Sequence, residues 1–230
     1  MERKIEWNAP WMTEEHLMFK ESTRKFFESE LLPHTERWAE QGVVDRDFWF
    51  KAGEAGLLGA SAPEEFGGVG ADQSFDALTM YEHARAGDSG WGFGVHNICT
   101  HYIIAYANEE QKARWLPDLI SGEIVPALAM TEPGTGSDVQ AVRTTADKDG
   151  DDYIINGSKI FITNGQQADI VIVVAKTDKD AGGRGISLIV VETADAEGFA
   201  RGRNLKKLGM KGQDTSELFF ENVRVPRANL

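Results

Sequence analysis

The chain has 230 residues, 41% of them hydrophobic, and 24 Lys and Arg stand against 37 Asp and Glu, so the formal net charge is −13. This length allows one large or two small globular domains, and the hydrophobic content excludes a disordered chain. The acidic balance argues against a nucleic-acid partner, because neutralising phosphates needs a basic surface. No apolar run is long enough to cross a bilayer, so we expect no membrane insertion.

Two features bear on the cellular compartment. Cys99 is the only cysteine, so no internal disulfide can form and a reducing compartment is expected. Residues 1–7 lack the apolar region of a secretory signal. We therefore predict a cytoplasmic protein of bacterial type.

The first part of the chain has the pattern of helices. Thr13 can cap a helix whose first turn is acidic, and further helices are predicted to start at Asp47 and Asp72. Residues 109–123 predict another helix, which we expect Pro117 to interrupt.

The pattern changes to strands after Val125. Asn156-Gly157 stands between two apolar segments, which predicts a two-residue hairpin turn. Residues 169–176 and 185–192 are short β-branched runs, typical of strands buried on both faces, and residues 216–226 supply a last strand. We therefore predict the α+β class in two domains. Residues 1–122 form an all-α helical domain, and residues 123–230 form an antiparallel β-barrel or sandwich.

One stretch at the entry to the β domain concentrates residues that suit a ligand. Residues 127–141, ALAMTEPGTGSDVQA, bring two glycines, hydroxyls and an acid close together. No Lys follows the second glycine as in a P-loop, and the GxGxxG dinucleotide pattern is absent. Two interpretations stay open from the residues alone: a loop that binds phosphate through its amides and Ser137, or a plain turn between domains.

Other polar residues favour ordinary structural roles. Thr163 closes an apolar strand just before a turn, and Lys206, Lys207 and Lys211 fit a solvated loop. The five histidines show no spacing typical of metal ligands, so we predict no metal site.

Six segments, in order and over nearly the whole chain, resemble signatures of the acyl-CoA dehydrogenase family. The upstream segments are RKFFESELLPHTERW, KAGEAGLLGASAPEEFGGVG and NEEQKARWLPDLISGE. The downstream segments are AMTEPGTGSDVQAVRT, YIINGSKIFITNGQQADIVIVVA and LKKLGMKGQDTSELFFENVRVP. The resemblance is greatest to long-chain members.

The resemblance implies a fold and a cofactor. The family has an N-terminal helical domain, a middle β-barrel and a C-terminal four-helix domain, usually in a homotetramer, and it binds FAD. Two matching segments would contact FAD, with Thr131 at the pyrimidine edge of the flavin, Phe161 against the ring and Thr163 donating to N5. The residues assigned to FAD in this way are Leu128, Met130, Thr131, Gly136, Ser137, Phe161, Ile162 and Thr163. Many relatives have Trp in place of Phe161 and Tyr in place of Leu128.

The resemblance also implies a substrate and a reaction. Ser137 and Arg184 would contact the CoA part of an acyl-CoA, and N-terminal helices near Tyr81 and residues 91–104 would line part of the acyl cavity. The family removes two hydrogens from the thioester to give a trans-2-enoyl-CoA in fatty-acid β-oxidation, and electron-transfer flavoprotein is the expected acceptor. A glutamate takes the α proton, and relatives carry it on the C-terminal domain.

That glutamate is expected beyond residue 230, because the chain stops where the middle domain ends. We do not assign its role to Glu132, and we expect this truncated chain to be inactive alone. Two alternatives remain: an acyl-CoA oxidase or flavin monooxygenase relative on the same fold, or a non-catalytic scaffold that binds flavin and acyl-CoA.

Overall fold

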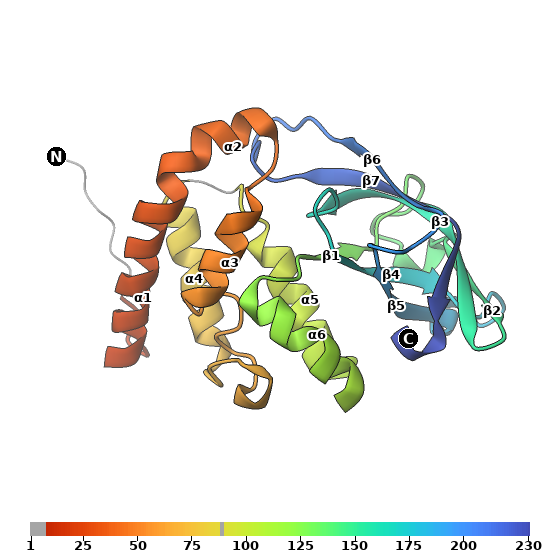
Figure 1. The fold of residues 1–230 in the computed structure, drawn as a ribbon, viewed down its shortest axis with the longest axis horizontal. Helices are drawn as coiled ribbons and strands as arrows, with labels where there is room; N and C mark the ends of the chain where they lie inside the picture. The colour runs from red at the N-terminus through yellow and green to blue at the C-terminus, as the bar shows by residue number, and fades with distance from the viewer. Residues whose placement is uncertain (1–7, 88–89) are drawn as a thin grey trace.

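Helices precede strands along the chain, as Figure 1 shows for residues 8–87 and 90–230, which the computed structural model describes. The helices are α1 (Glu14–Phe26), α2 (Thr35–Gln41), α3 (Arg46–Glu54), α4 (Gln73–Arg85), α5 (Phe93–Tyr106) and α6 (Glu109–Ser121). The strands are β1 (Pro126–Ala129), β2 (Thr145–Asp149), β3 (Asp152–Thr163), β4 (Ile170–Lys176), β5 (Ile186–Glu192), β6 (Phe199–Asn204) and β7 (Thr215–Pro226). The predicted succession of a helical and a β domain is confirmed.

The exact domain limits stay a prediction, and they fall between the end of α6 and the start of β1. Residues 1–7, where the sequence predicts no secretory signal, lie outside the described residues. None of the helices within the described ranges combines the length and apolar character needed to span a membrane.

Side chains at the predicted helix starts explain two of the helices. Asp72 accepts a hydrogen bond from the Ser74 N–H at 2.8 Å, so it caps α4 as predicted. Thr13 precedes α1, and its N–H donates to His16 Nδ1 at 3.1 Å. The third start was misplaced slightly, because Asp45 rather than Asp47 occupies the cap position of α3.

The predicted interruption at Pro117 is wrong, because α6 continues through it to Ser121. A proline inside a helix removes a hydrogen bond and costs about 3 kcal/mol. Asn108 caps the start of the helix, where its side chain accepts a hydrogen bond from the Gln111 N–H at 2.9 Å. Gly122, in a left-handed conformation, caps the end. The helix also buries a continuous apolar face, which offsets the missing bond.

The predicted hairpin turn at Asn156-Gly157 is also wrong. Strand β3 continues through these residues without a turn. The turn between β2 and β3 lies instead at Gly150, which has φ 63°. Gly157 instead follows a bulge in the β3–β7 ladder, where the register shifts after Ile155. A Cβ at residue 157 would lie 2.3 Å from Thr144 Oγ1, so a close backbone approach requires glycine there.

This contact predicts the effect of Gly157→Ala. The substitution is expected to lower the free energy of unfolding by about 1–3 kcal/mol, because the added methyl group forces Thr144 to shift. Urea unfolding measures the change. Gly134→Ala is the control, since nothing lies within 4 Å of a Cβ there. Equal stability of the two variants would contradict the close-approach explanation.

The sheet is curled and mixed. Its strands follow the order β1-β4-β2-β3-β7-β6, with β5 paired to the free side of β4. The predicted antiparallel arrangement holds for most pairs, but β1 runs parallel to β4, and β2 touches β4 in a short parallel pair. The β2–β3 hairpin between them returns the chain, so β4 takes the direction of β1.

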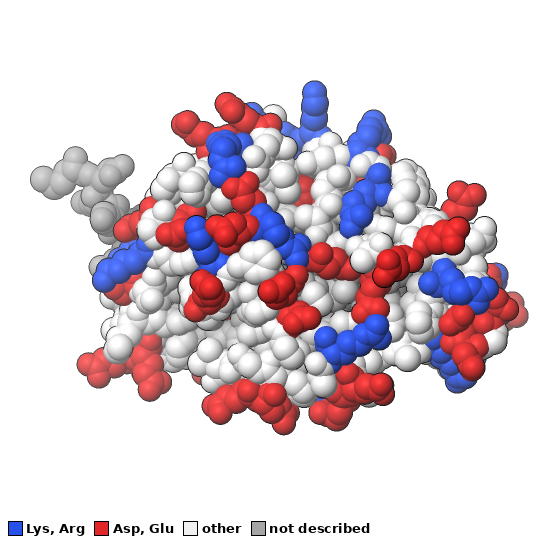
Figure 2. Space-filling model, viewed as in Figure 1, with Lys and Arg blue, Asp and Glu red and all other residues white. Residues whose placement is uncertain are grey.

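Helices α5 and α6 lie against the sheet (Figure 1). Their buried residues Cys99, Ile103 and Leu116 meet Ile172 of β4 and Val190 of β5. Alternate residues of β4, such as Val173, face the interior of the curled sheet, so β4 is buried on both faces as predicted. On the face seen in Figure 2, Asp and Glu side chains are interspersed with Lys and Arg, and no continuous basic field covers that face.

Candidate functional site

The segment after β1 and the end of β3 lie side by side. The N–H of Ile160 donates to the carbonyl of Thr131 at 2.9 Å, and Lys159 Nζ donates to the carbonyl of Met130 at 3.1 Å. The structure therefore brings together two of the sequence segments that were predicted to share one ligand, although 29 residues separate Met130 from Lys159.

Phe161 has an unusual backbone and an exposed ring. Its φ is 63°, and 64% of the residue is exposed. A bulky residue rarely adopts positive φ, and such conformations persist where the surrounding structure fixes them and often where a ligand binds. The ladder to β7 skips from Lys159 to Ile162 at this point, so Phe161 stands out of the sheet.

Asn164 ties the end of this segment to the helical domain. Its side-chain amide donates to the carbonyl of Gly92 at 3.2 Å and of Pro126 at 3.1 Å. Gly92 precedes α5, and a Cβ there would lie 1.8 Å from Asn164 Oδ1. Asn164 therefore links three elements at one buried contact: the turn after β3, the start of α5 and the start of β1.

Three of the predicted ligand hydroxyls are available. Within residues 8–87 and 90–230, no protein group hydrogen-bonds to the hydroxyl of Thr131, Ser137 or Thr163. Neighbouring hydroxyls differ, since Thr135 donates to the Ala141 carbonyl at 3.1 Å and Thr144 donates to Glu132 at 2.6 Å.

The predicted CoA-contacting residues lie on adjacent loops. Ser137 precedes a short 3-10 helix over Val139–Ala141, and Arg184 lies in another over Gly182–Gly185. Residues of both helices line one surface hollow, and both predicted contact residues are exposed.

Ile162, Leu128 and Gly136, three other predicted FAD residues, differ in how deeply they are buried. The side chain of Ile162 is buried in the sheet core, so only its backbone can face a ligand. Leu128 packs into the cluster between helices and sheet, and Gly136 lies exposed in the loop. Their roles, like those of the other predicted FAD residues, stay predictions.

Glu132 proves to be a structural acid. It is 6% exposed, and its carboxylate accepts from Arg143 N–H at 2.7 Å, from Thr144 N–H and Oγ1 at 2.9 and 2.6 Å, and from Lys159 Nζ at 3.0 Å. Burial raises the pKa of this carboxyl, but the hydrogen bonds outweigh it and hold the pKa below its ordinary value. Such an acid is not free to act as a base.

Sequence reasoning missed Lys159, the partner of Glu132. This lysine is 1% exposed, and burial lowers its pKa, with Glu132 opposing the shift. The only signal in the sequence was a lysine inside an otherwise apolar strand.

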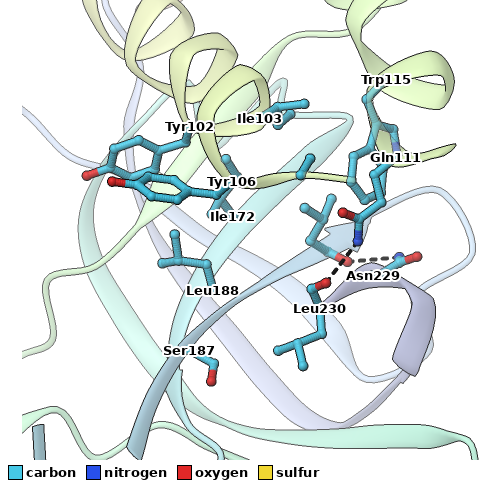
Figure 3. A pocket seen from close by; sticks show the side chains of 12 residues that line it. Tyr102, Ile103, Tyr106, Gln111, Trp115, Ile172, Ser187, Leu188, Asn229 and Leu230 are labelled. Carbon is cyan, nitrogen blue, oxygen red and sulfur yellow. Dashed lines mark hydrogen bonds between the residues drawn. The ribbon is translucent and has the colours of Figure 1, made fainter. Parts of the chain in front are cut away.

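A separate cavity lies between the ends of α5 and α6 and the sheet (Figure 3). It has a volume of about 340 Å³, and Tyr102, Tyr106 and Leu188 form much of its apolar wall. Gln111 closes one side by donating to the carbonyl of Leu230 at 2.9 Å. Of the residues predicted to line an acyl cavity, Tyr102 and Ile103 line this one and Tyr81 does not, and the acyl cavity itself stays a prediction.

The sequence matches known protein families in both of its parts. Residues 13–123 match the family described as acyl-CoA dehydrogenase, N-terminal domain, and residues 127–223 match acyl-CoA dehydrogenase, middle domain. The chain belongs to the acyl-CoA dehydrogenase family. It is 49% identical over 219 residues to the mitochondrial long-chain specific acyl-CoA dehydrogenase of Sus scrofa, covering 94% of this chain and 51% of that protein.

Solved structures of acyl-CoA dehydrogenases agree with this assignment. The crystal structure of acyl-CoA dehydrogenase from Geobacillus kaustophilus has a TM-score of 0.93 and 48% identity, covering 97% of this chain and 59% of that one. A glutaryl-CoA dehydrogenase from Mycobacterium smegmatis, solved in complex with FADH2, has a TM-score of 0.86 and 32% identity over 95% of this chain and 55% of its own. The chain spans about half the length of the curated relatives it matches.

Proposed function

We propose that this chain is the flavin- and acyl-CoA-binding part of a FAD-dependent acyl-CoA dehydrogenase that acts on long-chain thioesters in the cytoplasm. The observation that carries the proposal is the meeting of two separate segments at Thr131 and Ile160, within a chain of this family. The acyl-chain preference rests on identity to long-chain relatives.

The residues at this meeting point fit a flavin. The unpartnered hydroxyls of Thr131 and Thr163 supply polar contacts for its heterocyclic edge, and the exposed ring of Phe161 offers an aromatic surface. Ser137 and Arg184 lie on adjacent loops, where an anionic CoA moiety would find a hydroxyl and a cation.

FAD, when bound, supplies the capacity to accept the electrons of the removed hydrogens. This chain's residues bind and orient the flavin and the thioester, and the base that takes the α proton comes from outside residues 1–230. Electron-transfer flavoprotein remains the acceptor we propose, and a homotetramer remains the proposed assembly of the full-length protein.

Replacing Thr163 tests the flavin site. Thr163→Val removes a donor at nearly constant volume and is expected to weaken FAD binding by about 1 kcal/mol, roughly fivefold. Titration with FAD, followed by flavin fluorescence, measures the dissociation constant. Thr145→Val, at another half-buried strand threonine, is the control and is expected to bind FAD as the wild type does.

The same titration tests the proposal as a whole. We expect the chain to bind FAD more weakly than a full-length relative, because the C-terminal domain completes the site in those proteins. A wild-type chain that does not bind FAD at any accessible concentration would overturn the proposed function.

One observation favours the alternative of a non-catalytic scaffold. Glu132, which directly follows the predicted flavin residue Thr131, has both carboxylate oxygens occupied by hydrogen bonds. Reduction of bound flavin by an acyl-CoA in the longer protein would exclude this alternative.

A further inference from the structure

Lys159 holds one of the most completely satisfied charges in the protein. Its ammonium group has three donors, and all three find buried oxygens: the carbonyls of Met130 at 3.1 Å and Val174 at 2.7 Å, and Glu132 Oε1 at 3.0 Å. The side chain thereby connects β3 to β4 and to the loop that follows β1.

Glu132 extends the connection to the start of β2. Its two oxygens receive the backbone N–H groups of Arg143 and Thr144 and the Thr144 hydroxyl, at 2.6 to 2.9 Å. The pair therefore fixes the loop over residues 130–144 at both of its ends.

A need for stability alone does not explain such a pair. Replacing a buried ion pair by apolar residues of similar volume is often neutral or stabilising, because desolvation offsets the attraction between the charges. A buried, fully bonded pair does impose geometry, since each oxygen and each N–H has one satisfactory arrangement.

The segments that this pair holds in place also carry the predicted flavin residues. Glu132 directly follows Thr131, and Lys159 lies two residues before Phe161. Between them, the Ile160 N–H donates to the Thr131 carbonyl at 2.9 Å, at the point where the register of the β3–β7 ladder shifts. Phe161, with its positive φ, therefore lies between two fixed points, Lys159 two residues before it and Asn164 three residues after it.

We propose that Lys159 and Glu132 are positioning residues that hold the Thr131 loop and the Phe161–Thr163 segment in the relative placement that a flavin ring requires. This inference rests on the proposed function. The two residues act through the backbones of Met130, Thr131 and Phe161, without contact with the substrate.

The test compares FAD binding in matched variants of the chain. Lys159→Met removes the three donors at similar length, and its dissociation constant for FAD is expected to rise on the order of tenfold. The long-wavelength absorption band of the bound flavin is expected to shift, because the ring is held differently. Glu82→Gln is the control: Glu82 is 1% exposed and accepts from Arg24 at 3.1 Å, but it lies in the helical domain.

Both variants break a buried pair, so both lose stability in urea unfolding. Only Lys159→Met is expected to change the affinity and the flavin spectrum. Unchanged binding in Lys159→Met, or an equal loss in Glu82→Gln, would show that the pair has only a structural role. Failure of the wild type to bind FAD is a different result, which removes the proposed function and the inference with it.

A double variant tests whether the two residues form one device. Because they support the same loop, Glu132→Gln combined with Lys159→Met is expected to weaken binding about as much as Lys159→Met alone. If the double variant instead lost FAD affinity by the product of the two single-variant factors, a shared role would be contradicted.

If Lys159→Met does not fold, Thr144→Val takes its place. This variant removes one hydrogen bond to Glu132 while all charges stay paired, and it is expected to weaken FAD binding about threefold. An unchanged dissociation constant and spectrum in a folded Thr144→Val would then overturn the proposal.

Discussion

Mixed without oxygen with FAD and acyl-CoA thioesters of several lengths, the 230-residue chain is expected to leave the flavin oxidised. The proposed reaction needs a base for the weakly acidic α proton, and a well-placed base contributes about 10²–10⁴-fold. The proposed function also assigns part of the positioning of the reactants to residues outside this chain, and such positioning can supply roughly 7–11 kcal/mol of the barrier.

Bleaching of the oxidised flavin band is the measurement, and the full-length Geobacillus kaustophilus relative is the positive control. Bleaching by this chain at a rate comparable to that relative would mean that a base lies within residues 1–230. In that case the saturated hydrogen bonds of Glu132 would have to open during the reaction.

The helical domain is expected to lose stability as the pH falls, because His96 is buried in its neutral form. Burial lowers the pKa of His96 to about 4 from 6.5, with the Leu119 carbonyl opposing the shift. Its Nε2 lies 2.9 Å from that carbonyl, while Nδ1 has no hydrogen-bond partner among the residues that the structure describes. A second proton on the ring would therefore be buried without an acceptor.

The sign follows from which state binds the proton. Between about pH 6.5 and pH 4 the unfolded chain takes up a proton at His96 and the folded chain does not, so stability is full above this window and falls as the pH decreases through it. At pH 4, this one residue is expected to have lowered the free energy of unfolding by about 3 kcal/mol relative to neutral pH.

Urea unfolding at several pH values measures the effect. His96→Gln keeps a donor for the Leu119 carbonyl and cannot titrate, so its stability is expected to depend less on pH by about this amount. Thr100→Val, at a buried residue of the same helix that does not titrate, is the control and is expected to keep the wild-type pH dependence. Parallel curves for wild type and His96→Gln would exclude His96 as the cause.

Local pattern predicted the elements whose environment follows from their own residues. The β-branched run at residues 170–176 is a strand buried on both faces, and Asp72 caps its helix through a neighbouring N–H. The Asp72 cap involves a residue only two positions away, and the apolar pattern of β4 lies within its own seven residues.

The errors arose where distant residues decide the outcome. Asn156-Gly157 is a strong turn signal, but Thr144 and Asn222 lie opposite and extend the strand through it. Pro117 is tolerated because the rest of α6 is capped and buried.

The candidate site was visible only in part for the same reason. Ser137 and the loop around it could be proposed as a ligand site from the glycines and hydroxyls that gather there, whereas the assignment of Thr131 to a flavin came from the family resemblance. The link between Glu132 and Lys159 could not, since it depends on the meeting of two strands. Nor does phenylalanine signal positive φ, so the projection of Phe161 was invisible before the fold was known.

The parallel pairing of β1 with β4 also makes one edge of the sheet depend on a long-range contact. Pro126 pairs with Ile170, and both β2 and β3 lie between these partners in the sequence. Closing so long a loop has an entropic cost that a local hairpin such as β2–β3 avoids. The loop after β1, which carries Met130 and Thr131, thus depends on non-local contacts, and local contacts alone cannot assemble the region proposed to bind the cofactor.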